Sequence, residues 1–142
     1  MSKVKPTRKH TVQTFISKKA KGEKISLLTA YDAFTASLLD AAGIDSILVG
    51  DSAANVLHGY GSTLPITMDI MVAHTAAVVR GTKQALVIAD MPFLSFQPSE
   101  ETAILNAGRF LKESGAEAAT LEGGLEIAPL VARLVSLGIP VM

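Results

Sequence analysis

Three acidic residues each follow the last residue of a short apolar run. The runs ILVGD, LVIAD and ATLE place Asp51, Asp90 and Glu122 in this position. If the runs are neighbouring parallel strands, the three carboxylates lie on one rim of a sheet, with the outer pair about 10 Å apart. Carboxylates that close repel one another unless a cation or a proton lies between them. Hard oxygen ligands without histidine or thiol favour magnesium, or manganese, over zinc.

Each of these acidic residues also has a simpler interpretation, because a carboxylate at a strand end commonly caps the loop or helix that follows. That alternative is weaker for three residues together than for one. Asp32 follows the first apolar run in the same register, but a helix begins directly after it, which favours a capping role. Ser52, beside Asp51, could donate a hydrogen bond to a ligand. It has neither the GxSxG elbow nor the partnered histidine of a nucleophile.

Other chemical motifs are weak. The segment HGYGSTLP at 58–65 has two of the glycines of a phosphate-binding loop but lacks the third, and no helix opens directly after it. His10, His58 and His74 show no metal-ligand spacing, so we assign no chemistry to them and interpret His74, in mid-helix, as a packing or surface residue. The chain has no cysteine, which excludes disulfides, thiolate zinc sites and cysteine nucleophiles.

The composition predicts one globular unit, because 49% of the 142 residues are hydrophobic and 18% are charged. Thirteen basic residues balance thirteen acidic ones, so neither nucleic acid nor an anionic membrane surface is the expected partner. A small neutral or anionic metabolite fits better. No apolar stretch approaches the roughly 20 residues of a membrane helix. The basic start is interpreted as a solvated tail rather than a signal peptide, and the chain is compatible with the cytoplasm.

Strand-length apolar runs alternate with segments of helical period, the pattern of a parallel sheet built from βα units. The predicted strands cover 25–31, 46–50, 85–90 and 118–122, and 139–142 begin a fifth. In the first helix after a strand, the buried face is predicted to hold Phe34, Leu38, Ala41 and Ala42, with Gly43 in the left-handed position after the helix.

The later helices have clear beginnings. Thr67 and Ser99 are predicted to cap the second and third helices, and Glu100 and Glu101 stand at the favourable dipole end of the third. The buried face of the third is predicted as Ala103, Ala107, Phe110 and Leu111. The fourth strand breaks at two glycines into a helix that tolerates Pro129 in its first turn.

Four βα units and the start of a fifth strand amount to half of an eight-stranded barrel of about 250 residues. We therefore predict that residues 1–142 are the amino-terminal half of one barrel domain, with a basic tail and a leading helix at about 1–24. A half barrel leaves two sheet edges unpaired and one apolar face uncovered. The expectation is a truncated product, or a chain completed by a second one. A complete small doubly wound sheet is the alternative.

A set of six strings, in order, extends from about residue 25 to residue 124. The strings are TAYD (29–32), ILVGDS (47–52), HGYGSTLPIT (58–67), HTAAVVRG (74–81), IADMPF (88–93) and LEGG (121–124). Each string is weak by itself, but their combination and spacing are typical of one family. The chain resembles the amino-terminal half of the ketopantoate (3-methyl-2-oxobutanoate) hydroxymethyltransferases.

This resemblance implies a (β/α)₈ TIM barrel of the phosphoenolpyruvate mutase and isocitrate lyase type. It implies magnesium bound by Asp51, Asp90 and Glu122, and a keto acid, ketoisovalerate, that chelates the metal and contacts Asp51, Ser52 and Asp90. In the family, the metal is expected to stabilise an enolate, which attacks the one-carbon unit of the co-substrate methylenetetrahydrofolate in pantothenate biosynthesis. Members of the family commonly form homo-oligomers, often decamers.

Two features depart from the family pattern. The family usually has KIEGG or KLEGG, whose lysine pairs with the substrate, whereas this chain has TLEGG with Thr120, which cannot supply that charge. The family's general base, a glutamate, lies on the second half of the barrel, so no catalytic base is assigned on this chain. A non-catalytic remnant, or a lyase of the same superfamily acting on another 2-oxo acid, are the alternative functions.

Overall fold

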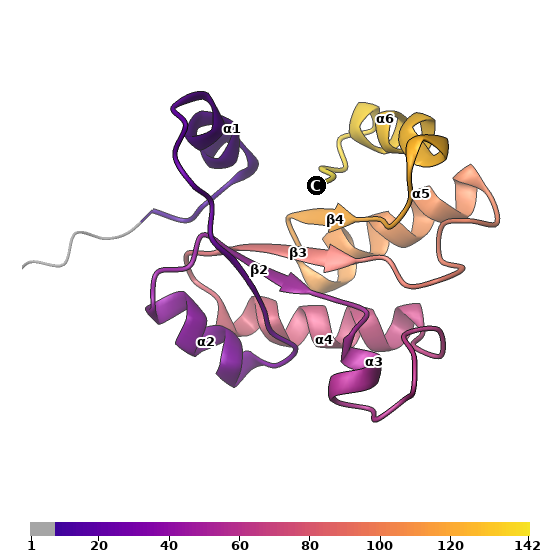
Figure 1. Ribbon diagram of the computed structural model, residues 1–142, viewed down its shortest axis with the longest axis horizontal. Coiled ribbons are helices and arrows are strands. Elements are labelled where there is room, and N and C mark those ends of the chain that lie inside the picture. The colour runs from indigo at the N-terminus through magenta and orange to yellow at the C-terminus, as the bar shows by residue number, and fades with distance from the viewer. Residues whose placement is uncertain (1–7) are drawn as a thin grey trace, which may run out of the picture.

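Short apolar runs form the four strands of one parallel sheet, in a computed structural model that describes residues 8–142 (Figure 1). The strands are β1 (Leu27–Thr29), β2 (Ser46–Val49), β3 (Leu86–Asp90) and β4 (Ala118–Thr120). Their order in the sheet is β1-β2-β3-β4, and every neighbouring pair is parallel. The predicted fifth strand is reduced to a single bridge between Ala119 and Val141. This is the strand order of consecutive βα units in a barrel.

The helices follow the strands as the sequence predicts, with additions. They are α1 (Val12–Ala20), α2 (Ala33–Ala41), α3 (Ala53–Val56), α4 (Met68–Gly81), α5 (Glu100–Arg109) with a π-helical extension η1 (Phe110–Ser114), the 3₁₀ turn η2 (Leu125–Ile127), and α6 (Ala128–Ser136). Thr67 and Ser99 cap α4 and α5 as predicted. Gly43 has the predicted left-handed conformation, with φ of 83°. The short helix α3 was not predicted. No helix in the described range 8–142 is long and apolar enough to cross a membrane.

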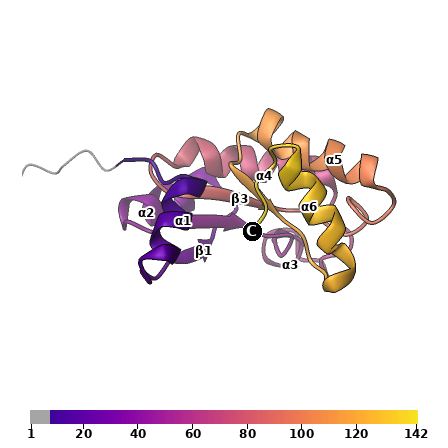
Figure 2. The same cartoon turned by 90° about the horizontal axis from the view of Figure 1, so that it is seen from above.

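The two faces of the sheet are covered differently (Figures 1 and 2). One face packs on α2, α4 and α5, and the buried side chains of this main core include Ile47, Val87, Met71 and Phe110. On the opposite face, Leu86, Ile88 and Ala118 form a smaller cluster against Phe15 of α1. The predicted buried positions of α5 are confirmed, since Ala103, Ala107 and Phe110 are fully buried and Leu111 is partly buried.

The predicted buried face of α2 is wrong. Phe34 and Leu38 are 72% and 56% exposed, and Ala41 and Ala42 are exposed as well. The helix instead turns Ala36 and the acidic Asp40 inward, both of which are almost completely buried. Apolar periodicity alone therefore predicted the wrong face of the helix to be buried.

Asp40 explains this orientation. Its carboxylate accepts hydrogen bonds from the backbone N–H groups of Lys83, Gln84 and Ala85, at 3.0, 2.9 and 2.7 Å. Burial raises the pKa of Asp40, but these hydrogen bonds outweigh burial, so that the pKa lies below its usual value. A charged group that satisfies three donors of the turn before β3 therefore decides which face of α2 is buried.

Replacing Asp40 by alanine is expected to destabilise the chain by about 3 kcal/mol, because it leaves buried backbone donors without an acceptor. Replacing the larger and more hydrophobic Phe34 by alanine should change the stability by only about 0.5 kcal/mol, since that side chain is mostly exposed. Urea unfolding of both variants measures the difference. A larger loss for Phe34→Ala than for Asp40→Ala would contradict this account of α2.

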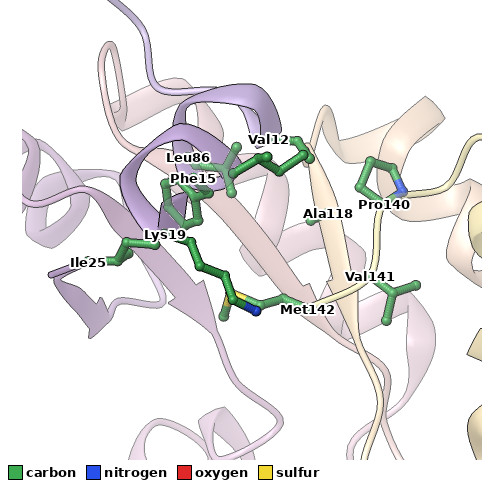
Figure 3. Close-up of a pocket in the computed structure, with 10 residues that line it drawn as sticks. Val12, Phe15, Lys19, Ile25, Leu86, Ala118, Pro140, Val141 and Met142 are labelled. Atoms are coloured by element: carbon green, nitrogen blue, oxygen red, sulfur yellow. The ribbon is translucent and has the colours of Figure 1, made fainter. Parts of the chain in front are cut away.

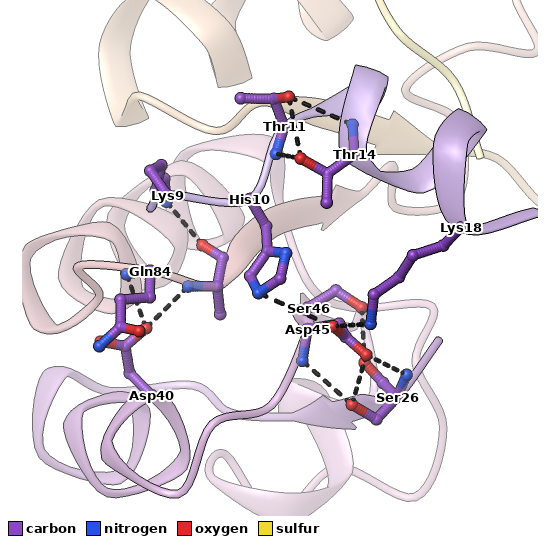
Figure 4. A network of polar contacts seen from close by, with 11 residues as sticks. Lys9, His10, Thr11, Thr14, Lys18, Ser26, Asp40, Asp45, Ser46 and Gln84 are labelled. Carbon is purple, nitrogen blue, oxygen red and sulfur yellow. Dashed lines mark hydrogen bonds and ion pairs between the residues drawn. The ribbon is translucent and has the colours of Figure 1, made fainter. Parts of the chain in front are cut away.

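A second polar network holds α1 against the amino-terminal end of the sheet (Figure 4). The Asp45 carboxylate accepts hydrogen bonds from Lys18 of α1 and from both the N–H and the hydroxyl of Ser26, the latter two at 2.9 Å. β1 covers Leu27–Thr29 and is shorter at both ends than the predicted 25–31; the N–H of Ser26, just before it, is bound by the Asp45 side chain. The predicted leading helix is thus α1, whereas most of the predicted basic tail, residues 1–7, lies outside the described residues.

The stability of the chain is expected to fall in acid through Asp45. Burial raises the pKa of this carboxyl, but the hydrogen bonds from Lys18 and Ser26 outweigh it and hold the pKa at about 2, below the usual 3.8. The unfolded chain then binds the proton more tightly, so the stabilisation is present above pH 3.8 and is lost as the pH falls toward 2. The loss is about 2 kcal/mol.

Chemical unfolding at several pH values between 6 and 2 measures this effect. In Asp45→Asn, the acid-dependent loss should be smaller than in the parent chain, while the exposed control Glu101→Gln should keep it. Equal acid sensitivity of Asp45→Asn and the parent chain would contradict the assignment to this residue.

Candidate metal and keto-acid site

The carboxyl ends of β2, β3 and β4 bring the predicted acidic residues to one rim. Asp90 is the last residue of β3, and its Oδ2 accepts a hydrogen bond from the backbone N–H of Asp51 at 3.2 Å. Asp51 and Glu122 both line a cavity of about 100 Å³ at this rim. The other residues that line it are Thr63, Leu64, Met91, Phe93, Phe96 and Gln97. The three carboxylates therefore belong to one region of the molecule.

Asp90 is the electrostatically unusual member of this group. Its side chain is buried, and Oδ1 has no hydrogen-bond partner. Burial, together with the negative charges of Asp51 and Glu122, raises the pKa of Asp90 to about 6, although the hydrogen bond from the Asp51 N–H lowers it. A buried carboxylate oxygen without a donor is a costly arrangement that a cation would relieve.

The donor chemistry of the rim fits a hard divalent cation such as magnesium, because it offers carboxylate oxygens and an unpartnered oxygen of Asp90. The three side chains do not surround a cation site on their own. Glu122 is exposed, and within residues 8–142 no three or more histidine, aspartate or glutamate side chains are close enough together to hold a metal ion by themselves. Magnesium commonly keeps several waters and takes only one or two carboxylates directly. The metal role of these residues stays a prediction.

Ser52 is paired with a tyrosine that the sequence did not single out. The Ser52 hydroxyl and the Tyr31 hydroxyl lie 2.8 Å apart, and both side chains are half-buried. In this contact the Ser52 hydroxyl is bound to a phenol hydroxyl rather than to an imidazole. It depends on Gly50, because a Cβ there would lie 2.8 Å from the Ser52 Oγ. The string TAYD was the available signal for Tyr31.

Thr120 stands beside the acidic rim. It is the last residue of β4 and the register partner of Asp90, and its carbonyl oxygen accepts the N–H of Met91 at 3.0 Å. Register partners on adjacent strands direct their side chains to the same face of the sheet. The residue at position 120 is thus placed to influence the Asp90 carboxylate.

Asp32 is confirmed as a cap rather than a rim ligand. Its carboxylate accepts the backbone N–H of Thr35 at 2.8 Å at the beginning of α2. The hydrogen bonds from the Thr35 N–H and hydroxyl lower the pKa of Asp32. This residue has the same register after a strand as the rim acids but a different role.

A larger groove of about 320 Å³ lies at the other end of the sheet (Figure 3). It runs between α1 and the last residues of the chain, and Phe15, Leu86 and Met142 are among its walls. Among the lining residues in the described part of the chain, Lys19 is the one that carries a charge. The groove lacks the convergent polar groups of a catalytic site, so the smaller cavity at the acidic rim is the better candidate.

Comparison with solved structures defines the class of fold. A 2,3-dimethylmalate lyase, a member of the PEP mutase/isocitrate lyase superfamily, aligns with 92% of this chain and 50% of its own, with a TM-score of 0.67 and 17% identity. A phosphoenolpyruvate phosphomutase from Streptomyces platensis subsp. rosaceus aligns with 79% of this chain and 38% of its own, with a TM-score of 0.64 and 16% identity. A phosphonopyruvate hydrolase, in complex with oxalate and Mg²⁺, aligns with 77% of this chain and 37% of its own, with a TM-score of 0.63 and 15% identity. The fold is therefore part of the α/β barrel of that superfamily.

Sequence comparison gives the family. The profile described as ketopantoate hydroxymethyltransferase matches residues 9–142. The 3-methyl-2-oxobutanoate hydroxymethyltransferase of Syntrophus aciditrophicus is 54% identical over 142 residues, which cover all of this chain and 52% of that protein. Its counterpart in Carboxydothermus hydrogenoformans is 54% identical over 132 residues, 93% of this chain and 48% of that protein. This chain belongs to the ketopantoate hydroxymethyltransferase family, and it spans about half the length of these relatives.

Proposed function

We propose that this chain supplies the metal-binding and keto-acid-binding half of a hydroxymethyltransferase. The reaction transfers a hydroxymethyl group from methylenetetrahydrofolate to ketoisovalerate and gives ketopantoate, a step of pantothenate biosynthesis. The observation that carries the proposal is the unpartnered, buried Oδ1 of Asp90 on a rim shared with Asp51 and Glu122. Family membership supports the identity of the substrates.

Asp51, Asp90 and Glu122 are the residues that would hold magnesium. When bound, the ion would withdraw charge from the keto oxygen of the substrate and make the adjacent C–H more acidic. The Mg²⁺ and oxalate of the phosphonopyruvate hydrolase complex support this choice, because oxalate, like the substrate, presents two neighbouring oxygens. The half-buried position of Asp51 and the burial of Asp90 limit the water that competes for these contacts.

The Ser52 and Tyr31 hydroxyls are proposed to orient the keto acid. Only one of the two protons is used in the contact between them, at 2.8 Å, because one hydroxyl donates and the other accepts. The hydroxyl that accepts keeps its own proton for a third partner. We propose that this proton is donated to a carboxylate oxygen of the substrate beside Asp51.

A chimera tests the proposal directly. Residues 1–142 are fused to the remaining carboxyl-terminal half of the S. aciditrophicus relative, which this chain matches over 52% of its length. The chimera is expected to form ketopantoate from ketoisovalerate and methylenetetrahydrofolate, and to need Mg²⁺. A chimera that melts cooperatively yet forms no ketopantoate, under conditions where the intact relative does, would contradict the function. Turnover of a 2-oxo acid without folate would favour a lyase instead.

In the same chimera, Thr120→Lys is expected to tighten ketoisovalerate binding. A charge-assisted contact is worth about 1.5–3 kcal/mol, or roughly tenfold or more in affinity. Thr120→Met is the matched control, because it adds length without charge. The KM for ketoisovalerate measures the effect. Equal KM values in the lysine and methionine variants would show that the family's lysine role does not transfer to position 120.

A further inference from the structure

Two histidines that are 16 residues apart in the sequence meet in the structure, and neither is among the rim carboxylates. His58, in the loop after α3, and His74, on α4, have their Nε2 atoms 3.0 Å apart. Their rings stand edge to face, with centroids separated by 5.3 Å and an interplanar angle of 70°. The spacing of these two residues along the chain gave no indication of this contact, so no chemistry could be predicted for either.

His74 is held in a defined tautomer. Its Nδ1 lies 2.9 Å from the backbone carbonyl oxygen of Tyr31. A carbonyl can only accept, so Nδ1 carries the proton, and in the neutral ring the Nε2 lone pair points toward His58. A hydrogen bond from the second ring nitrogen to a backbone carbonyl is the usual support of a metal-binding histidine.

The separation of the two nitrogens matches a shared metal ion. With metal–nitrogen bonds of about 2.0–2.1 Å, nitrogens 3.0 Å apart subtend an angle of about 95° at the metal. This is close to the angle between neighbouring ligands in square-planar or octahedral coordination, the geometries of Cu²⁺ and Ni²⁺, and narrower than the tetrahedral angle of zinc. Imidazole nitrogens also suit these ions, whereas the oxygen ligands at the rim suit magnesium.

We infer that His58 and His74 form a binding site for a divalent transition-metal ion, with nickel or copper preferred to zinc. To open the site, the neutral ring of the exposed His58 moves its proton from Nε2 to Nδ1, so both Nε2 lone pairs can face the ion. Water completes the coordination, because within residues 8–142 no third histidine, cysteine or carboxylate is close enough to join. The ion would link α4 to the loop that leads to Thr63 and Leu64 of the rim cavity.

Calorimetric titration of the chain with NiCl₂ tests this inference. One site is expected, and His58→Ala should weaken nickel binding at least about tenfold, since loss of even a supporting group costs about 10–100-fold in metal affinity. His58 is exposed, so this variant should fold normally. His10→Gln, the matched control at the remaining histidine of the chain, should bind nickel with the same affinity as the parent chain. Asp90→Asn should also bind nickel normally, which separates this site from the proposed magnesium site.

Copper provides a second measurement. The electron paramagnetic resonance spectrum of one equivalent of Cu²⁺ should show two coordinating imidazole nitrogens in the parent chain and fewer in His74→Gln. Equal nickel affinity in the parent and His58→Ala would overturn the inference and leave the pair as a hydrogen bond only. Loss of nickel binding in His10→Gln with retention in His58→Ala would also overturn it.

Discussion

Changing Asp90 to asparagine in the chimera is expected to weaken magnesium binding at least about tenfold. The variant keeps the size of the side chain but removes the negative charge and replaces one carboxylate oxygen by an amide nitrogen that cannot bind a cation. Mutating a residue that only supports a metal ligand typically lowers metal affinity about 10–100-fold. Asp90 is proposed as a direct ligand, so its loss should weaken binding at least as much. Isothermal titration with MgCl₂ measures the loss, and ketopantoate formation should fall with it.

Asp32→Ala is the comparison variant, because Asp32 also follows a strand but caps α2. It should cost about 1 kcal/mol of stability and leave magnesium affinity unchanged. The Asp90 variant should not lose stability in the absence of metal, since it removes a buried charge with an unpartnered oxygen. Equal magnesium affinity in the two variants would reject the division between ligand and cap.

The 142-residue chain assayed alone is expected to show no hydroxymethyltransferase turnover, even with magnesium and both substrates supplied. Because all three rim carboxylates are proposed to bind the cation, none of them is expected to remove the substrate proton. Loss of general-base catalysis typically lowers the rate by about 10²–10⁴-fold. The measurement is the rate of ketopantoate formation, compared between the 142-residue chain and the chimera at equal protein concentration.

The open sheet adds a second reason for this expectation. Within residues 8–142, β1 pairs with β2 alone, and its Leu28 is 51% exposed. An unpaired strand edge favours association with other chains and leaves the rim less well ordered for catalysis. Size-exclusion chromatography should therefore show the bare chain larger than a monomer and the chimera less prone to nonspecific association. A monomeric 142-residue chain with an ordinary enzymatic rate would contradict both arguments.

The order and number of βα units could be predicted because strand-length apolar runs and helix caps are local signals. Thr67, Ser99 and Gly43 act within one turn of their own helix, and each was placed correctly. The buried face of α2 was not predictable in this way. It depends on a carboxylate of Asp40 that satisfies donors more than 40 residues away, and hydrophobic periodicity contains no information about such a contact.

The candidate site shows the same distinction. The common rim of Asp51, Asp90 and Glu122 could be predicted because a position at the carboxyl end of a parallel strand fixes the rim on which a side chain lies. Whether the three carboxylates hold one cation remains a prediction. The Tyr31 and Ser52 pair joins residues 21 positions apart in a geometry that no spacing rule describes. The same holds for the two histidines, which come from a loop and a helix.

The position of α1 at the beginning of the chain has a consequence for folding during synthesis. Each strand pairs with the next one in sequence, so β1, β2, β3 and β4 can join the sheet in the order in which a ribosome releases them. Phe15 of α1 is already present when Leu86 and Ile88 arrive, and it covers them on the face that lacks the other helices. We therefore expect α1 to shield these apolar strand residues from solvent as soon as they leave the ribosome.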